Sequence, residues 1–418
     1  MTSDSRKADP RQSAALFGHL LRWGCAVVIW DFGLFIFHRG NTVWAVLSVL
    51  LFALPLALQA TPWVMTRVYA LWFGVFLVVQ SLLAPFLKSD YVTLQPNLRS
   101  TVDVRTAEAP GMRSGLRHIT TDAKGFRVFP PVDYARKQGV RIFAIGGSTT
   151  EDAMVDDGST WTHLVQEGLR SRHISAEVIN TGVAGLRARN HLATLKVVLG
   201  YHPDLVLFLV GANDWNKHIR DEFERSYLSF RPPVLRNSPF GQVLERFIVA
   251  PVELRVRGDS NSGQHLVIGP SEAVGGAKGR SYERAVHYVF RPTEVSVGYR
   301  EDMEEISRTC RASGVRCMFL TQLHAYSAAA PEELQRLYWM TPPYVDYTLD
   351  LESMVHIANV YNQFLVEFAK RNGHPLCDVA SGMPPSTQFF YDDMHLTDDG
   401  AARVADLVFQ CVEQALAN

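Results

Sequence analysis

The sequence predicts an α/β domain around a five-stranded parallel sheet, preceded by an N-terminal region of transmembrane helices. Two observations support this. After residue 88, apolar runs of strand length alternate with amphipathic helical runs, as expected for a parallel sheet with helices on both faces. Before residue 88, three long apolar stretches follow one another. We therefore expect a membrane region over 1–88, a linker and lead-in segment over 89–138, and an α/β domain over 139–418.

The three apolar stretches cover about 20–37, 42–58 and 67–87. Each is close to the roughly 20 residues that a helix needs to cross the hydrocarbon core. Tryptophan and tyrosine residues mark their ends, and such rings favour the level of the lipid headgroups. A cleaved signal peptide would explain only one of the stretches.

Positive charge predicts the orientation of these spans. Arg6, Lys7, Arg11 and Arg22 precede or open the first span, whereas Arg39 alone lies between the first and the second. Because positive charge favours the cytoplasm, three spans place everything after Lys88 outside. We expect a multi-pass protein of the inner (plasma) membrane with its α/β domain on the extracytoplasmic side.

The strands are predicted by short apolar runs that are rich in Val, Ile, Leu and Phe. They cover 140–145 (VRIFAI), 176–180 (AEVIN), 204–210 (DLVLFLV), 316–320 (RCMFL) and 375–379 (PLCDV). The third is almost unbroken in its apolar character, as in a strand covered on both faces. Helical spacing of apolar residues predicts helices over about 160–172, 187–199, 351–371 and 399–416. A long insertion at about 217–297 breaks the alternation. Such insertions are usually lids, binding loops or partly disordered segments, and a flexible surface excursion is the alternative.

Charge and cysteine spacing exclude some functions. A formal net charge of −1 lacks the basic excess that nucleic-acid binding needs. No CxxC or Cys/His cluster has metal spacing, so we expect neither metal nor cofactor. Cys310, Cys317, Cys377 and Cys411 could form disulfides, with three possible connectivities, or remain buried thiols. We favour a buried thiol for Cys377.

Ser148 is the candidate nucleophile. It follows the first strand in Gly146-Gly147-Ser148, where two glycines allow a tight turn before a helix. Amide groups at a helix N-terminus stabilise negative charge. An anion-binding turn is the alternative interpretation of this motif.

Gly185 follows the second strand and Asn213 follows the third. In a parallel sheet the carboxyl ends of the strands meet at one edge, where ligands bind. The amides of Ser148 and Gly185 and the side chain of Asn213 could therefore form an oxyanion hole.

Asp392 and His395 follow the fifth strand. A serine hydroxyl needs a base such as histidine, and the histidine needs an acid that fixes its tautomer. Two residues three positions apart could both reach the nucleophile from one short segment. Each motif is weak alone, but together they supply every part of one acyl-transfer mechanism.

These blocks resemble the SGNH (GDSL-like) hydrolase family, whose motifs contribute a Ser, a Gly, an Asn and a His. The resemblance covers roughly 125–216 and 298–418, together with the segment 118–127 (HITTDAKGFR). It implies a flavodoxin-like three-layer sandwich and a triad of Ser148, His395 and Asp392. The family's usual Gly-Asp-Ser is Gly-Gly-Ser here, and the missing aspartate is not a triad member.

Other polar residues near the predicted strand ends have alternative interpretations. Asp393 could replace Asp392, although spacing and resemblance favour Asp392. Asp214 and Trp215 could line the pocket or be structural, and we expect His324 and His163 to be structural.

We expect hydrolysis of an O-acyl ester, for example an acetyl group, on a glycan or lipid of the cell envelope. The first alternative is an O-acyltransferase that modifies an envelope polysaccharide together with a membrane partner protein. The second is a non-catalytic scaffold subunit, against which the intact set of catalytic residue types argues.

Overall fold

The computed structural model describes residues 67, 90–104, 111–227, 265–266, 286–338 and 347–417. The chain divides into two units, Met1–Lys88 with Pro232–Glu253 and Ser89–Arg231 with Leu254–Asn418. Every described residue except Arg67 belongs to the second unit. The predicted membrane spans therefore lie outside the described residues, except for Arg67 at the start of the third. Within the described part of the chain, no helix combines the length and apolar character needed to span a membrane.

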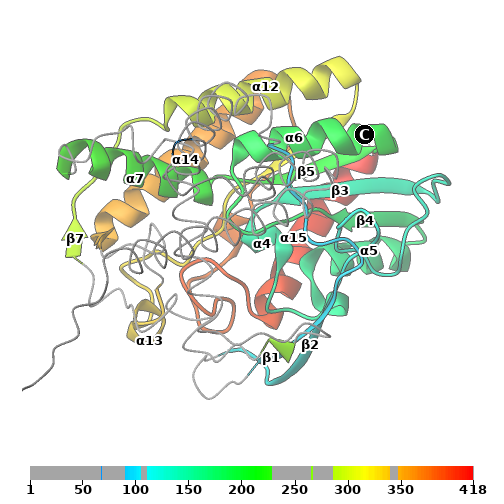
Figure 1. The fold of residues 1–418 in the computed structure, drawn as a ribbon, viewed down its shortest axis with the longest axis horizontal. Coiled ribbons are helices and arrows are strands. Elements are labelled where there is room, and N and C mark those ends of the chain that lie inside the picture. Colours follow the sequence, from blue (N-terminus) through cyan, green and yellow to red (C-terminus); the bar gives the residue numbers. More distant parts are fainter. Residues whose placement is uncertain are drawn as a thin grey trace, which may run out of the picture. The chain divides into compact units, whose positions relative to one another are not determined.

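A parallel sheet of five strands forms the centre of the second unit, as the sequence predicts (Figure 1). Its order is β10-β8-β5-β3-β4, and each pairing is parallel. Every residue of β5 is buried, which explains its unbroken apolar sequence. The strands are β3 (Val140–Gly146), β4 (Ala176–Asn180), β5 (Leu205–Leu209), β8 (Arg316–Leu320) and β10 (Leu376–Cys377).

Helices cover both faces of this sheet, which gives the expected three layers (Figure 1). On one face, α5 (Trp161–Ser171) packs against α15 (Asp398–Ala417). On the other, α6 (Ala188–Val198) packs against α12 (Val297–Ser313), and α14 (Leu351–Asn372) lies with them.

The sequence prediction missed α12. Most of its residues are polar, and its buried side chains form a narrow stripe: Tyr299, Met303, Ile306, Ser307 and Cys310. Ser296 caps its N-terminus by accepting a hydrogen bond from the N–H of Tyr299. Gly314 ends the helix in the left-handed conformation, with φ of 69°. The amphipathic pattern of α12 is therefore weak, but Ser296 and Gly314 mark both of its ends in the sequence.

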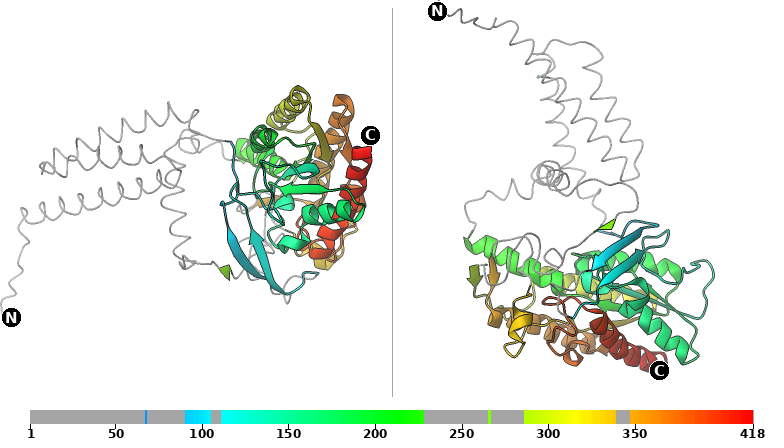
Figure 2. Two further views of the ribbon diagram at one scale, coloured as in Figure 1. Left: turned by 90° about the vertical axis from the view of Figure 1, so that its right-hand side faces the viewer. Right: turned by 90° about the horizontal axis from the view of Figure 1, so that it is seen from below.

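The lead-in segment folds as part of the second unit. Strands β1 (Arg99–Val104) and β2 (Gly115–Thr120) form an antiparallel pair and lie side by side in Figure 2. Their apolar residues join a small core with Met154 and Tyr391, which lie close in sequence to Ser148 and His395. The lead-in segment thus supports both ends of the predicted site.

Shorter elements complete the described structure. Two-residue β6 (His265–Leu266), which comes from the insertion, pairs in parallel with β1. Strand β7 (Val286–Tyr288) pairs with β9 (Tyr347–Leu349). The first residues of the predicted insertion continue helix α7 (Ala212–Tyr227), while much of the remainder lies outside the described residues. The remaining short helices are α4 (Ser148–Glu151), α13 (Glu332–Gln335) and the 3₁₀ turns Asp157–Ser159, Leu199–Tyr201 and Ala380–Gly382.

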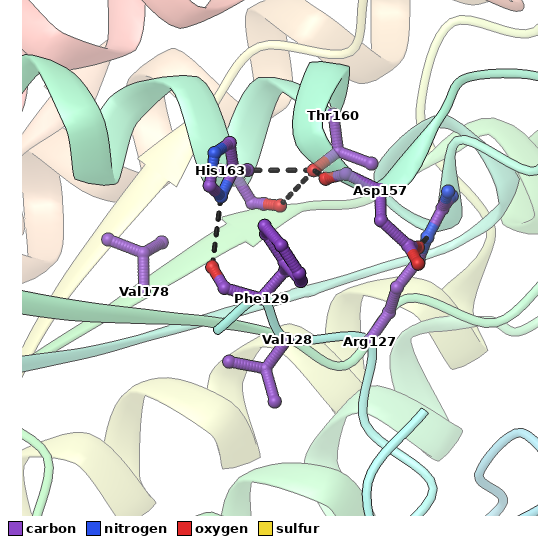
Figure 3. Close-up of a pocket in the computed structure, with 8 residues that line it drawn as sticks. Arg127, Val128, Phe129, Asp157, Thr160, His163 and Val178 are labelled. Carbon is purple, nitrogen blue, oxygen red and sulfur yellow. Dashed lines mark hydrogen bonds and ion pairs between the residues drawn. The ribbon is translucent and has the colours of Figure 1, made fainter. Parts of the chain in front are cut away.

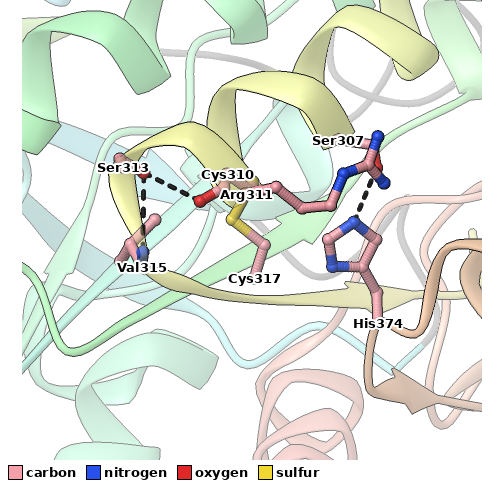
Figure 4. Close-up of a disulfide and its surroundings, with 7 residues drawn as sticks. All are labelled: Ser307, Cys310, Arg311, Ser313, Val315, Cys317 and His374. Carbon is pink, nitrogen blue, oxygen red and sulfur yellow. Dashed lines mark hydrogen bonds between the residues drawn. A yellow bond between two sulfur atoms is a disulfide. The ribbon is translucent and has the colours of Figure 1, made fainter.

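Two disulfides cross-link the domain. Cys310 at the end of α12 bonds to Cys317 in β8, beside a hydrogen-bond chain that joins Arg311, Ser307 and His374 (Figure 4). Cys377 in β10 bonds to Cys411 in α15. Our interpretation of Cys377 as a buried thiol is wrong, because α15 packs back on β10 and brings a partner from 34 residues further along the chain.

Candidate active site

The site lies where the order in which strands are added to the sheet reverses, between β3 and β5. Strand β3 is followed by β4 on one side, but its other neighbour, β5, comes next in sequence. Gly146 at the end of β3 pairs with Leu209 at the end of β5. Ser148 comes two residues after Gly146 and Asn213 four residues after Leu209, so both lie where such sheets bind ligands.

Ser148 is the first residue of the short helix α4. Its Oγ lies 2.8 Å from Nε2 of His395. The other ring nitrogen of His395, Nδ1, lies 2.7 Å from Oδ2 of Asp392. Because the carboxylate can only accept, Nδ1 carries the hydrogen and Nε2 is left to accept from the serine hydroxyl. The structure therefore brings the three predicted residues into one hydrogen-bonded chain.

Asp392 also fixes the turn that presents His395. Its Oδ1 accepts hydrogen bonds from the N–H groups of Met394, at 2.9 Å, and His395, at 2.8 Å. The ring of Tyr391 stacks on the imidazole, with 5.6 Å between centroids and 13° between planes. Asp392 is fully buried and His395 nearly so. The imidazole is thus held on two sides before any substrate arrives.

Asp393 points to a different partner. Its Oδ2 accepts a hydrogen bond of 2.6 Å from the hydroxyl of Tyr326. Burial and the neighbouring charge of Asp392 raise the pKa of Asp393 to about 7. Of the two candidate orienting residues, Asp392 contacts the ring nitrogen of His395, whereas Asp393 contacts Tyr326.

The electrostatic environment favours the protonated form of His395. Burial by itself lowers the pKa of an imidazole. Here the charge and the hydrogen bond of Asp392, with smaller contributions from Asp393 and Asp152, outweigh burial and raise the pKa of His395 above its ordinary value. A base of this kind retains a proton more firmly than free histidine does.

The side chain of Asn213, one of the predicted oxyanion donors, lies beside the turn that carries Ser148. One hydrogen of the Asn213 amide is donated to the carbonyl of Leu186 at 2.9 Å, which leaves the second for another acceptor. A Cβ atom added at Gly147 would lie only 2.9 Å from this amide nitrogen, so Asn213 is adjacent to the nucleophile turn. The N–H of Ser148 opens a helix and has no acceptor within it.

Gly185 has a positive φ of 79°, and a Cβ atom added there would meet nothing within 4 Å. It is exposed, next to Leu186, whose carbonyl Asn213 binds. The backbone N–H of Gly185 therefore lies on an open turn beside the amide of Asn213. All three predicted donors lie at the same edge of the sheet.

Asp214 and Trp215 have structural contacts. The carboxyl oxygens of Asp214 accept from the N–H of Ala188 at 3.1 and 3.3 Å, at the N-terminus of α6. Burial raises the pKa of Asp214 to about 7. Trp215 is fully buried, with its ring against Tyr361.

The two set-aside histidines are also held by the fold. Nδ1 of His163 lies 2.9 Å from the carbonyl of Phe129. The ring of His324 stacks on Tyr326 with 5.4 Å between centroids, and burial lowers its pKa to about 4.

Arg127 is a structural centre that sequence reasoning left without a role. Its guanidinium pairs with buried Asp157 at 2.8 Å. It also donates to the carbonyls of Glu151 and Asp152, both at 2.7 Å, at the end of helix α4. Its backbone pairs with Asn180 at the end of β4. The segment 118–127 was singled out by resemblance, but nothing in the sequence indicated these partners.

A small hollow with a cavity volume of about 10 Å³, roughly the room that one water molecule needs, lies beside Arg127 and Asp157 (Figure 3). Ligand pockets are usually larger, roughly 300–1,000 Å³. Its polar groups already bond to one another, as in the contact of His163 with Phe129. Neither Ser148 nor His395 lines it. Among the described residues, no group of three or more His, Cys, Asp or Glu could hold a metal ion.

The fold and the site together define a class of enzyme, the serine hydrolases that act on ester bonds. The sequence model of the GDSL-like lipase/acylhydrolase family matches residues 144–403, more than half of the 418-residue chain. The chain therefore belongs to the GDSL-like lipase/acylhydrolase family. No curated protein matches it.

Solved structures of hydrolases, two of them esterases, show a distant similarity. An acetylxylan esterase from Geobacillus stearothermophilus, solved as a catalytic mutant, is 11% identical, with 66% of this chain and 95% of that chain covered and a TM-score of 0.35. A psychrotrophic esterase from Pseudoalteromonas sp. is 10% identical, with 66% and 99% covered and a TM-score of 0.34. An α/β hydrolase from the metagenome of Lake Arreo is 14% identical, with 67% and 98% covered and a TM-score of 0.36.

Proposed function

We propose that this protein hydrolyses an O-acyl ester, in particular an acetyl ester, on a glycan or lipid of the cell envelope, with Ser148 as nucleophile. The observation that carries the proposal is the hydrogen-bonded chain from Ser148 through His395 to Asp392, with distances of 2.8 and 2.7 Å. A hydroxyl, a base and an orienting carboxylate in this order are what acyl transfer requires.

In the first half of the reaction, His395 Nε2 takes the hydroxyl proton as Ser148 Oγ attacks the ester carbonyl. The tetrahedral intermediate places its negative oxygen toward the N–H groups of Ser148 and Gly185 and the free amide hydrogen of Asn213. His395 then gives the proton to the departing alcohol, and the acyl group remains on Ser148.

In the second half, a water molecule loses a proton to His395 and attacks the acyl-enzyme. The carboxylic acid leaves, and Ser148 recovers its proton from His395. Asp392 holds the imidazole in one tautomer throughout and stabilises the imidazolium that forms twice in each cycle.

The proposed location rests on two features. The domain contains two disulfides, which form and persist in oxidising compartments and are rare in the cytosol. The residues before 88 carry three apolar stretches and a basic N-terminus. We therefore place the domain on the extracytoplasmic side of the inner membrane, anchored by the region 1–88. A reporter fused after Asn418 that works only in the cytoplasm should be inactive, and an active fusion would reverse this topology.

An ester hydrolysis assay on the full-length protein in detergent tests the proposed activity. Nitrophenyl acetate, a long-chain nitrophenyl ester and an acetylated glycan are offered to the native protein and to Ser148→Ala. Ser171→Ala is the matched control, because Ser171 lies exposed on α5. We expect hydrolysis and labelling by a fluorophosphonate probe in the native protein and the Ser171 variant, and neither in Ser148→Ala.

The substrates separate the remaining alternatives. Preference for the acetyl ester and release of acetate from the glycan support the proposal, whereas preference for the long chain points to a lipid. Transfer to a glycan acceptor that outpaces hydrolysis would indicate an acyltransferase. A folded native protein that neither labels nor hydrolyses would contradict a catalytic role.

A further inference from the structure

The loop that carries Gly185 is fastened to the nucleophile helix at its start. Asn180 Nδ2 donates to the carbonyl of Thr150, and Asn180 Oδ1 accepts from the N–H of Gly182 at 2.8 Å. At Gly182, an added Cβ atom would lie 2.3 Å from the backbone nitrogen of Glu151. Only glycine allows the loop to approach α4 this closely.

Nearer to Gly185, the side chains of Glu151 and Asn213 hold the loop. Glu151 Oε2 accepts a hydrogen bond of 2.5 Å from the N–H of Ala184. On the other side, Asn213 holds the carbonyl of Leu186 at 2.9 Å. Gly185 thus lies between two residues that are each tied to a different helix.

Packing does not hold Gly185 itself. The residue is exposed, and no atom lies within 4 Å of the position that its Cβ would occupy. The direction of its N–H therefore depends on the two flanking ties. An oxyanion donor stabilises charge only when it points at the place where the oxyanion forms, so this direction matters for the rate.

Glu151 is well placed to link the loop to the nucleophile. It stands three residues after Ser148, so both lie on the same face of the one-turn helix α4. Arg127 donates a hydrogen bond of 2.7 Å to the carbonyl of Glu151, which fixes the position from which the side chain extends. Its carboxyl is partly buried.

We propose that Glu151 is a positioning residue, whose carboxylate holds the Ala184–Gly185 turn so that the Gly185 N–H points at the oxyanion formed on Ser148. The inference rests on the proposed function, because it assigns Glu151 a part in the same oxyanion hole. Glu151 itself touches no reacting atom and acts through Gly185.

The expected effect lies on kcat. Loss of one oxyanion donor typically costs about 10²–10³ in rate. Glu151→Ala removes one of the two ties, so we expect kcat to fall by about 10- to 100-fold, with KM changed by less than about threefold because ground-state binding is intact. Glu151→Gln keeps an oxygen that accepts from Ala184, and it should restore kcat to within about threefold of the native value.

The experiment compares these variants as full-length proteins in nitrophenyl ester hydrolysis, with thermal unfolding as the check on folding. Glu167→Ala is the matched control, because Glu167 lies on α5 and pairs on the surface with Arg170. Ala184→Pro removes the N–H and leaves Glu151 in place, so it reproduces the loss if the tie is responsible. It also serves as the test should Glu151→Ala fail to fold.

The outcomes separate this inference from the proposed function. If Ser148→Ala abolishes activity while Glu151→Ala and Ala184→Pro keep native kcat, the positioning role is wrong and the esterase stands. A raised KM with unchanged kcat in Glu151→Ala also overturns the positioning role, and so does a kcat that Glu151→Gln fails to restore. If the native protein shows no hydrolysis that depends on Ser148, the proposed function itself fails.

Discussion

The carboxylate of Asp392 accepts a hydrogen bond from Nδ1 of His395 at 2.7 Å, although both residues belong to one four-residue segment. The second oxygen of Asp392 binds the backbone of that segment, so the turn and the imidazole share one anchor. The next residue, Asp393, is committed to Tyr326. Two adjacent aspartates therefore have separate partners, and this contrast can be tested.

Asp392→Asn should reduce kcat by about 10³–10⁴, because an amide at this position favours the wrong tautomer of His395. Asp393→Asn is the matched control. Its amide oxygen can still accept from Tyr326, and we expect its kcat within about tenfold of the native value. Steady-state hydrolysis of a nitrophenyl ester measures both. Equal losses would mean that the two carboxylates share the role.

The pH dependence of kcat/KM should show an acid limb with its midpoint above pH 6.5, the unperturbed pKa of histidine. Burial lowers the pKa of His395, but the carboxylates of Asp392, Asp393 and Asp152 outweigh burial, so the net shift is upward. The reaction needs the neutral imidazole as its base. Activity should therefore be lost as pH falls through this raised pKa. A midpoint below 6.5 would contradict the electrostatic account.

The contribution of His395 to folding stability should change with pH in the opposite direction to activity. A raised pKa in the folded state means that the protonated imidazole favours folding. This contribution is complete below the unfolded pKa and is lost as pH rises through the folded one. Protonation of His395 therefore lowers activity on the acid side, whereas its deprotonation lowers stability on the alkaline side. Thermal unfolding across the same pH range thus shows whether the acid limb reflects catalysis or loss of the fold.

Removal of Cys377–Cys411 should impair catalysis more than removal of Cys310–Cys317. The first bridge spans 34 residues and encloses both Asp392 and His395, whereas the second spans 7. In the loop-entropy account, the bridges contribute about 4 and about 2.5 kcal/mol to stability. We compare the paired Cys→Ser variants by thermal unfolding and kcat. A larger loss of kcat in the Cys310 and Cys317 pair would refute this ranking.

Arg127→Gln should destabilise the domain by about 3–5 kcal/mol, because it leaves the buried carboxylate of Asp157 without its cationic partner. It should also lower kcat, since Arg127 holds the last carbonyls of α4. Chemical unfolding and ester hydrolysis measure the two effects. Combining it with Asp157→Asn should cost less than the two single changes added together, and strict additivity would show that the pair is not coupled.

The sequence predicted the sheet because strands buried on both faces must be continuously apolar, as β5 is. It predicted α5 and α14 because their apolar residues recur at helical spacing. It failed at α12, whose buried stripe is narrow and interrupted by charge. It also underestimated the lead-in segment, because the apolar residues of β1 and β2 are buried against Met154 and Tyr391, which are distant in sequence.

The sequence alone determined which residue types are available at the strand ends: a serine, a glycine, an asparagine and an Asp-x-x-His segment. Periodicity and turn residues are local properties, so they placed these four motifs at one edge of a sheet. It did not determine which aspartate serves His395 or which cysteine meets Cys377. Those choices depend on how segments far apart in the chain pack together. Only the tertiary structure decided them, by bringing Tyr326 to Asp393 and Cys411 to Cys377.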